Sequence, residues 1–161
     1  MFEDRLKEAK VTWKIRKFAD SIAYKENKPF EVSEIDGNVM LNEGINELWR
    51  LACSASGTVF SNANAYLGVG TDATAAGATD TGLIGTTAYV GMESGYPTYG
   101  TSQKATWKSS FGAAVGNHAW AEFTVGNADS NGGVNLNRKV SAQGTKTSGQ
   151  TWELTLEITL S

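Results

Sequence analysis

Residues Thr151–Leu160 read TWELTLEITL, and this stretch decides the fold class of the chain. Large apolar residues occupy every second position, and hydroxyl or carboxylate side chains fill the positions between them. This period of two is typical of a β-strand with one buried face, because an α-helix would spread the apolar groups around its circumference. The buried face needs other sheet to cover it, so the stretch predicts a domain built from packed sheets.

Strand-like patterns also occur along the rest of the chain. They cover these segments: Val11–Arg16, Phe30–Ile35, Val39–Leu41, Ala65–Leu67, Ala88–Met92, Lys104–Phe111, His118–Val125 and Val134–Val140. The basic outer face of Val11–Arg16 favours an edge strand. Short connections rich in Gly and Asn join the strands from Lys104 onward and predict an antiparallel meander. Residues 11–161 are therefore expected to form a single, mainly β domain, an antiparallel β-sandwich or jelly-roll-like fold.

One segment, Asn42–Cys53, has a clear helical pattern. Its apolar residues recur at spacings of three and four, and together with the preceding residue they form one stripe: Leu41, Ile45, Leu48, Trp49 and Ala52. Asn42 is the expected cap of this helix, and Gly57 lies beyond its end. A stripe of this kind is ordinarily part of the core, so we expect it to be buried.

The first ten residues, Met1–Lys10, differ from the domain that follows because they are dense in charge of both signs. Phe2, Leu6 and Ala9 recur at helix-like spacing, which predicts an N-terminal arm that is either a short helix or mobile. Its apolar content is too small for it to pack alone. We therefore expect this arm to contact a neighbouring subunit.

Composition limits the classes of partner. A chain of 161 residues is about one domain long, and its net charge of −3 favours neither a nucleic-acid nor a lipid-surface partner. Leu51–Gln103 contains no Lys or Arg and is rich in small residues, which suits contact with other protein. No stretch approaches the ~18 apolar residues of a membrane span, so a cytoplasmic, soluble product is expected.

The sequence shows no catalytic constellation. His118 is the only histidine and Cys53 the only cysteine, and Cys53 is expected to be a small buried hydrophobe. Asn127, Asp129 and Asn131 match half of a calcium loop, but Arg138 stands where the bidentate carboxylate belongs. The carboxylates Asp72, Asp80, Glu93 and Glu122 have no spacing that pairs them. We therefore predict no catalytic residue, no metal site and no cofactor.

Residues Gly68–Ala73 formally satisfy the dinucleotide-binding pattern G-x-G-x-x-A. A dinucleotide site needs a helix directly afterwards, with its N-terminus directed at the pyrophosphate. Thr74–Thr81 has no apolar helical stripe, so a Gly-rich loop between strands is the better interpretation. This loop, extended through Gly85, is nearly uncharged and is a candidate for contact with a neighbouring subunit.

From Asn38 onward the chain resembles a family of small, β-rich head proteins of tailed bacteriophages. The resemblance is carried by these stretches: Gly37–Ile45 (GNVMLNEGI), Asn62–Gly70 (NANAYLGVG), Gly95–Pro97, Ala119–Phe123 (AWAEF), Leu136–Lys139 (LNRK), Gly144–Gly149 (GTKTSG) and Trp152. It implies a non-enzymatic capsid decoration (cement) protein of the virion. Such a protein is made in the host cytoplasm and sits on the outside of the head, bound to the major capsid protein, typically as a homotrimer.

Six residues are candidates for contacts with the capsid or with another subunit: Phe2, Leu6, Lys10, Tyr96, Pro97 and Tyr99. The last three form an aromatic turn that either binds a ligand or packs on a sheet. A phage tail protein remains an alternative, as does a receptor- or carbohydrate-binding module in which Tyr96 and Tyr99 form an aromatic platform. An enzyme such as a cell-wall hydrolase ranks third.

Overall fold

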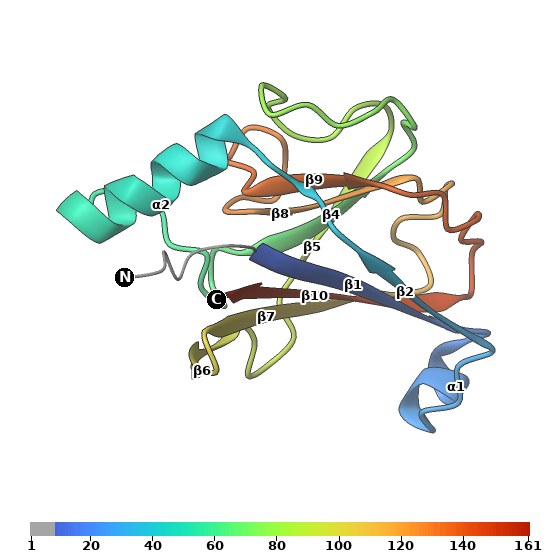
Figure 1. Ribbon diagram of the computed structural model, residues 1–161. Coiled ribbons are helices and arrows are strands. Elements are labelled where there is room, and N and C mark those ends of the chain that lie inside the picture. Colours follow the sequence, from blue (N-terminus) through green and yellow to red (C-terminus); the bar gives the residue numbers. More distant parts are fainter. Residues whose placement is uncertain (1–8) are drawn as a thin grey trace.

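Two antiparallel sheets of five strands each pack face to face in the structure, a computed structural model that describes residues 9–161 (Figure 1). The first, here called the β10 sheet, has this strand order: β2 (Glu31–Asp36), β1 (Ala9–Phe18), β10 (Thr151–Leu160), β7 (Lys104–Phe111) and β6 (Thr98–Thr101). The second, the β8 sheet, has this order: β3 (Val39–Met40), β9 (Asn137–Val140), β8 (Glu122–Gly126), β4 (Tyr66–Gly70) and β5 (Thr87–Gly91). The predicted mainly β sandwich is confirmed.

The alternating stretch at the end of the chain is the central strand of its sheet. β10 pairs with β1 on one side and with β7 on the other, and Leu156 lies opposite both Trp13 and Trp107. Leu154 and Leu156 have no exposed surface, whereas Thr155 and Glu157 on the other face are only partly buried. The period of two therefore marks one core face and one outer face, as predicted.

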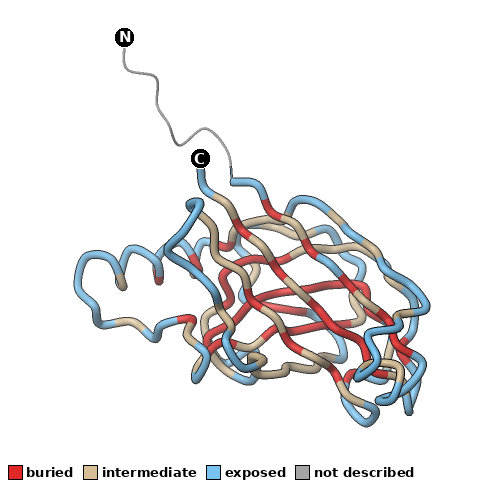
Figure 2. The backbone as a smooth tube through the Cα atoms, turned by 90° about the horizontal axis from the view of Figure 1, so that it is seen from below, coloured by how far each residue is buried: buried red, intermediate tan, exposed pale blue. Residues whose placement is uncertain are grey.

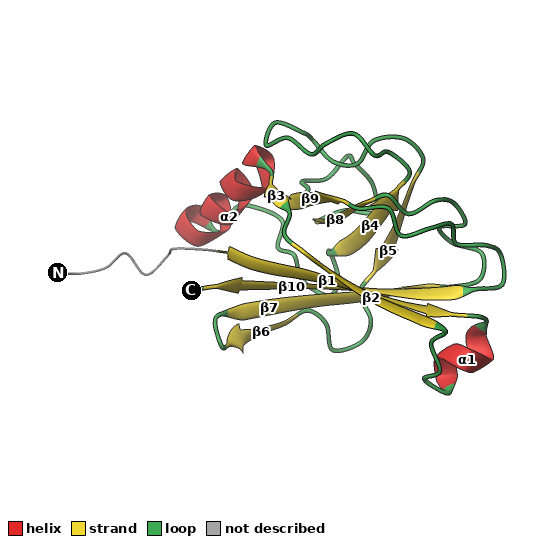
Figure 3. Cartoon of the chain, turned by 45° about the vertical axis from the view of Figure 1, so that its right-hand side comes forward, coloured by secondary structure: helices red, strands yellow, loops and turns green. Residues whose placement is uncertain are grey.

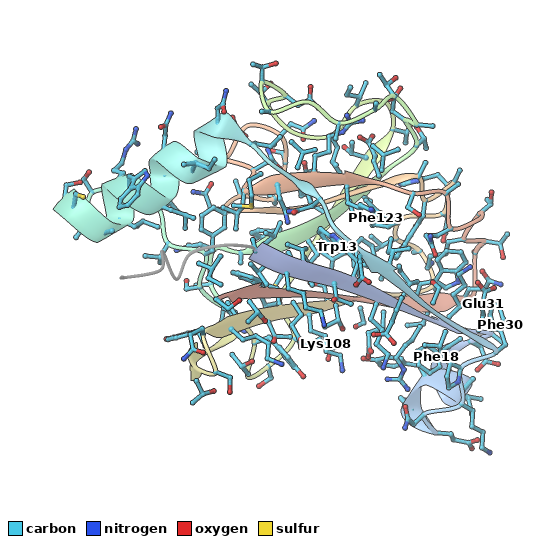
Figure 4. All side chains as sticks on the ribbon, viewed as in Figure 1. Trp13, Phe18, Phe30, Glu31, Lys108 and Phe123 are labelled. Carbon is cyan, nitrogen blue, oxygen red and sulfur yellow. The ribbon has the colours of Figure 1, made fainter. Side chains whose placement is uncertain are left out.

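Aromatic side chains from both sheets fill the space between them. Trp13 of β1 and Phe123 of β8 point toward one another with ring centroids 5.8 Å apart (Figure 4). The Trp120 ring lies 4.9 Å from the Trp152 ring, and 4.8 Å from Phe111, in edge-on arrangements. Such contacts add to the stability that comes from burying the large apolar area of these rings.

The connectivity differs from the predicted meander. β7 and β10 belong to one sheet while β8 and β9 belong to the other, so the chain crosses between sheets after β7 and again after β9. The prediction that β1 is an edge strand is also wrong, because β2 and β10 flank it. Short turn-rich connections do not distinguish a hairpin from a crossing between sheets, since both need the same residues.

Several predicted boundaries also move. β1 already includes Ala9 and Lys10, so the described part of the predicted arm continues directly into the sheet. β8 begins only at Glu122. Alternation over His118–Val125 predicts that Trp120 shares the outer face with Glu122, but Trp120 is fully buried in the core. β9 begins at Asn137. Alternation over Val134–Val140 predicts one common face for Leu136 and Arg138, and this prediction is wrong, because Leu136 packs in the core while Arg138 binds carboxylates outside it.

A short helix that the pattern did not predict, α1 (Ser21–Lys25), follows β1. Asp20 caps it, since its Oδ1 accepts hydrogen bonds from the backbone N–H groups of Ile22 at 2.9 Å and Ala23 at 2.8 Å. None of its residues is buried, so its sequence has no apolar periodicity that would predict a helix. Figure 3 shows α1 and α2 at opposite ends of the sandwich.

The predicted helix is present as α2 (Asn42–Ser54). Its cap position is Leu41, whose side chain makes no capping bond, so the predicted capping role of Asn42 is wrong. The helix ends at Ala55, which adopts the left-handed conformation with φ 52°. Figure 2 shows that the strands in the centre are buried, while the α2 end, at the left, is largely exposed.

Candidate functional site

The candidate site is the α2 end of the sandwich. Here α2 turns its polar face toward the body of the protein, so its apolar face is exposed. Glu47 is almost fully buried and accepts a hydrogen bond from the backbone N–H of Thr58 at 2.7 Å. One turn earlier, the Glu43 Oε1 atom accepts the backbone N–H of Asn135 at 2.7 Å. Carboxylates four positions apart share one helix face, so these two bonds fix the rotation of α2 about its own axis.

Gly44 allows α2 to cross the chain leading into β9 at backbone distance. A Cβ atom at this position would lie 2.5 Å from both the Cα and the carbonyl oxygen of Leu136, which is shorter than any real contact. Glycine inside a helix costs about 1 kcal/mol relative to alanine, so its presence here marks this close approach. This glycine was the one sequence signal for the orientation of the helix.

The consequence is that the apolar stripe of α2 faces outward. Ile45 and Leu48 are 39% and 40% exposed, and Trp49 is 65% exposed. Leu41, at the cap position, is fully buried, so the prediction that the stripe lies in the core is confirmed for Leu41 and wrong for the stripe residues within α2. The prediction that Cys53 is buried is also wrong, since Cys53 is exposed. Hydropathy identifies which face of a helix is apolar, but it does not reveal backbone donors elsewhere in the chain that hold the polar face.

An apolar groove, here called the α2 groove, lies between this helix and the end of the β10 sheet. It has a volume of about 340 Å³. Its walls are mostly carbon atoms, and the large side chains among them are Met40, Leu48, Trp107, Leu136, Ile158 and Leu160. Figure 1 shows α2, the start of β1, the end of β10 and the β6–β7 hairpin at this same end of the molecule.

A second hollow extends the apolar surface toward the β6–β7 hairpin. It shares Ala105 and Trp107 with the α2 groove and is otherwise lined by Val59, Phe60, Ser61, Pro97 and Tyr99. Tyr99 is 77% exposed, the highest value among the large hydrophobic residues of the described chain. Residues far apart in the sequence thus form one continuous apolar surface at the α2 end.

The structure brings only some of the predicted contact residues to this surface. Pro97 and Tyr99 line it. Tyr96 does not line either hollow, because its ring lies 5.6 Å from the Lys108 Nζ atom on the outer side of the β10 sheet. Lys10 is exposed in β1 opposite Thr159. The remaining candidates, Phe2 and Leu6, lie outside the described residues.

The loop between β4 and β5 is held against the outer face of the β8 sheet by one buried arginine. Arg138 pairs with Glu122 at 2.8 Å, with Asp80 at 3.0 Å and with Asp72 at 3.4 Å. Sequence spacing did not reveal that three of the four candidate carboxylates meet. Burial disfavours the charged guanidinium, but the hydrogen bonds and charges of Glu122 and Asp80 outweigh this effect and raise the pKa of Arg138.

The glycines of the G-x-G-x-x-A pattern allow neighbouring side chains to pack closely on the outer face of the β8 sheet. Gly68 and Gly70 lie within β4, and a Cβ atom at Gly68 would stand 2.6 Å from the Tyr89 ring. At Gly70 it would stand 2.3 Å from the Glu122 carboxylate. No helix follows β4 before β5 begins, so the geometry of a dinucleotide site is missing from this described segment.

The pH dependence of stability should report on Tyr89, whose hydroxyl donates to Asn131 beneath the β4–β5 loop. Burial, together with the Glu122 carboxylate, raises the pKa of Tyr89 well above its ordinary value of about 10. A raised pKa in the folded state gives stability that is complete below about pH 10 and is lost as the pH rises, because the unfolded chain ionises first. The free energy of unfolding should therefore fall by about 1.4 kcal/mol per pH unit above that point.

Urea unfolding followed by tryptophan fluorescence at about pH 7 and about pH 11 tests this. Tyr89→Phe should lose about 1 kcal/mol at the lower pH, from its missing hydrogen bond, and should lose less than the wild type on going to the higher pH. Tyr99→Phe, at an exposed site, is the matched control and should follow the wild type. Equal losses in the wild type and Tyr89→Phe would contradict the assignment.

The asparagines that match half of a calcium-binding loop make hydrogen bonds that stabilise loops. The Asn127 Oδ1 atom accepts the backbone N–H of Val134 at 2.8 Å within the connection between β8 and β9. Asn131 joins this connection to the β4–β5 loop, because its side chain bonds to both the N–H and the C=O of Leu83. Within residues 9–161, no group of three or more His, Cys, Asp and Glu is placed to hold a metal ion. Neither described helix has the length and apolar character needed to cross a membrane.

Comparisons of this chain with known protein families, with curated proteins and with solved structures find no match.

Proposed function

We propose that this protein is a non-enzymatic structural protein of a tailed-phage virion, a decoration protein that binds the major capsid protein on the outside of the head as a homo-oligomer. The observation that carries the proposal is the apolar surface at the α2 end, which a rigid sandwich holds exposed. The sequence resemblance to phage head proteins supports the same assignment. A trimer is the form that the resemblance implies.

The chemistry of the surface favours a protein partner. Contiguous exposed apolar surface on a soluble domain marks an interaction site, and aromatic residues are enriched at such interfaces. Ile45, Leu48 and Trp49 project from one helix face, as the anchors of helix-mediated contacts do. The hydrogen bonds of Glu43 and Glu47 hold this face in place before any partner binds, which lowers the entropy cost of association.

Binding to phage heads that lack the protein tests the proposal. Purified wild-type protein should cosediment with such heads and raise the temperature at which they release DNA. The gain follows from mass action: a ligand that binds only the intact shell stabilises it by about 2.7 kcal/mol per site at a hundredfold excess over Kd. Failure to cosediment at micromolar concentration, or binding without a rise in that temperature, would contradict the proposal.

Trp49→Asp should weaken this binding strongly, because truncating an aromatic anchor typically costs at least about 2 kcal/mol. The matched control is Ile22→Asp on α1 at the opposite end, since the two residues are 65% and 64% exposed. It should bind like the wild type. If both variants lose binding equally, the α2 end is not the contact surface.

The tail protein and the carbohydrate- or receptor-binding module are the alternatives, and the exposed aromatic rings of Trp49 and Tyr99 favour the latter. Sugars stack on such rings but also need polar partners close by. The side chains around the α2 groove are mainly aliphatic, with Gln103 and Lys104 among its few polar residues. Saturable glycan binding that Tyr99→Ala abolishes, without binding to heads, would favour this alternative.

A further inference from the structure

We infer that the α2 groove is the acceptor for residues Met1–Glu8 of a second copy of this chain, with Phe2 and Leu6 as the anchors. The inference identifies the contact that joins copies of the protein to each other. It does not depend on the proposed place in a virion, because it concerns the isolated protein in solution.

The acceptor is apolar, and no side chain among residues 9–161 fills it. Protein interiors are packed to the density of organic crystals, yet the α2 groove keeps about 340 Å³ open next to the core residues Trp107, Leu136 and Ile158. Leu48 and Leu160 form its outer walls and are 40% and 46% exposed. Apolar side chains from another chain would remove this surface from water and fill the hollow at the same time.

The donor begins at the rim of the same groove. Ala9 lines the groove and pairs with Leu160, so the described chain starts there. The preceding eight residues, MFEDRLKE, contain two large apolar side chains, Phe2 and Leu6, and span at most about 29 Å when extended. Donor and acceptor lie at one end of the molecule, so the symmetric copies of a closed oligomer can exchange these segments around their common axis.

We infer that the donor segment comes from a second copy and not from the same chain, because very few residues separate Leu6 from the start of β1. Only Lys7 and Glu8 stand between Leu6 and Ala9, which is already paired in β1. In β1 the odd-numbered residues Ala9, Val11 and Trp13 face the groove and the core. If β1 continued toward the N-terminus, the same alternation would direct Lys7 at the apolar wall and Leu6 away from it, which is unfavourable. A segment from a neighbour is free of this register.

Sedimentation velocity of full-length variants tests the exchange. Phe2→Ser/Leu6→Ser removes the donor anchors, and Leu48→Ser/Leu160→Ser removes apolar surface from the acceptor at partly exposed positions. Each should weaken self-association by about tenfold or more relative to the wild-type oligomer. Ile22→Ser/Val32→Ser, which alters residues that are 64% and 49% exposed away from the groove, should associate like the wild type. Circular dichroism checks that every variant is folded.

Mixing the two defective variants distinguishes a second copy from the same chain. The donor variant keeps an intact groove and the acceptor variant keeps intact anchors, so the mixture should form a hetero-oligomer that neither forms alone. A wild type that stays monomeric at micromolar concentration would overturn the inference, as would a donor variant that associates normally. A mixture that remains monomeric would also overturn it. Binding to phage heads is measured separately, so each proposal can fail without the other.

Discussion

Replacing Leu156 with aspartate should abolish soluble expression of the protein. Leu156 has no exposed surface and lies between Trp13 and Trp107 on the core face of the central strand. The new carboxylate would be buried among apolar side chains without a partner. Burying an unpaired charge costs several kcal/mol, which is most of the ~5–15 kcal/mol that stabilises a typical domain.

The neighbouring position provides the matched control. Thr155 is on the outer face of β10, opposite Lys14 of β1 and Lys108 of β7. An aspartate at this position would stand between two cations on a partly solvated face, so the soluble yield of Thr155→Asp should be close to that of the wild type. The measurement is the soluble fraction after expression, followed by thermal unfolding of whatever is soluble. Comparable damage from both substitutions would mean that β10 does not have one buried face.

Replacing Arg138 with methionine should destabilise the protein by about 3–5 kcal/mol, as is typical when one partner of a buried ion pair is removed. The guanidinium is fully buried and contacts three carboxylates, of which Glu122 is also fully buried. Without Arg138, the Glu122 charge has no compensating cation in the interior. The same change releases Asp72 and Asp80, so the β4–β5 loop should lose protection against hydrogen exchange.

A second substitution tests the physical cause. Glu122→Gln in the Arg138→Met background removes the buried charge but keeps an oxygen that can accept the backbone N–H of Ile84. Urea unfolding should show that the double variant is more stable than Arg138→Met alone. Lys139→Met, which changes the adjacent, less buried cation, is the control and should cost about 1 kcal/mol or less. An Arg138→Met variant that unfolds like the wild type would contradict this account.

The fold class and several strands could be predicted from local patterns. β7 occupies Lys104–Phe111 and β10 occupies Thr151–Leu160, which are the segments where the alternation predicts them. In both strands the side-chain alternation is a property of neighbouring residues, so a single stretch of sequence is enough to reveal which face is buried. The same reasoning located α2, because its apolar spacing is equally local.

Strand pairing and the candidate site depended on contacts between residues distant in the sequence. Nothing within Glu122 or Arg138 indicates that they meet, since their pairing requires β8 and β9 to be neighbours. Trp120 is buried although its position in the alternation predicts the outer face, because the chain reaches Trp120 before β8 begins. Short turns likewise left open whether the chain folds back in the same sheet or crosses to the other.

The amino-acid sequence by itself determined that this protein is a β-sandwich and that one helix carries an apolar stripe. Only the tertiary structure decided that the stripe faces outward. Hydropathy favours burial of that face, but Glu43 and Glu47 accept hydrogen bonds from the backbone N–H groups of Asn135 and Thr58, and Gly44 lets the helix approach the chain at Leu136. These bonds join segments up to 92 positions apart, so no local pattern contains them. The free energy of satisfying buried polar groups thus set the orientation of α2, and with it the candidate binding surface.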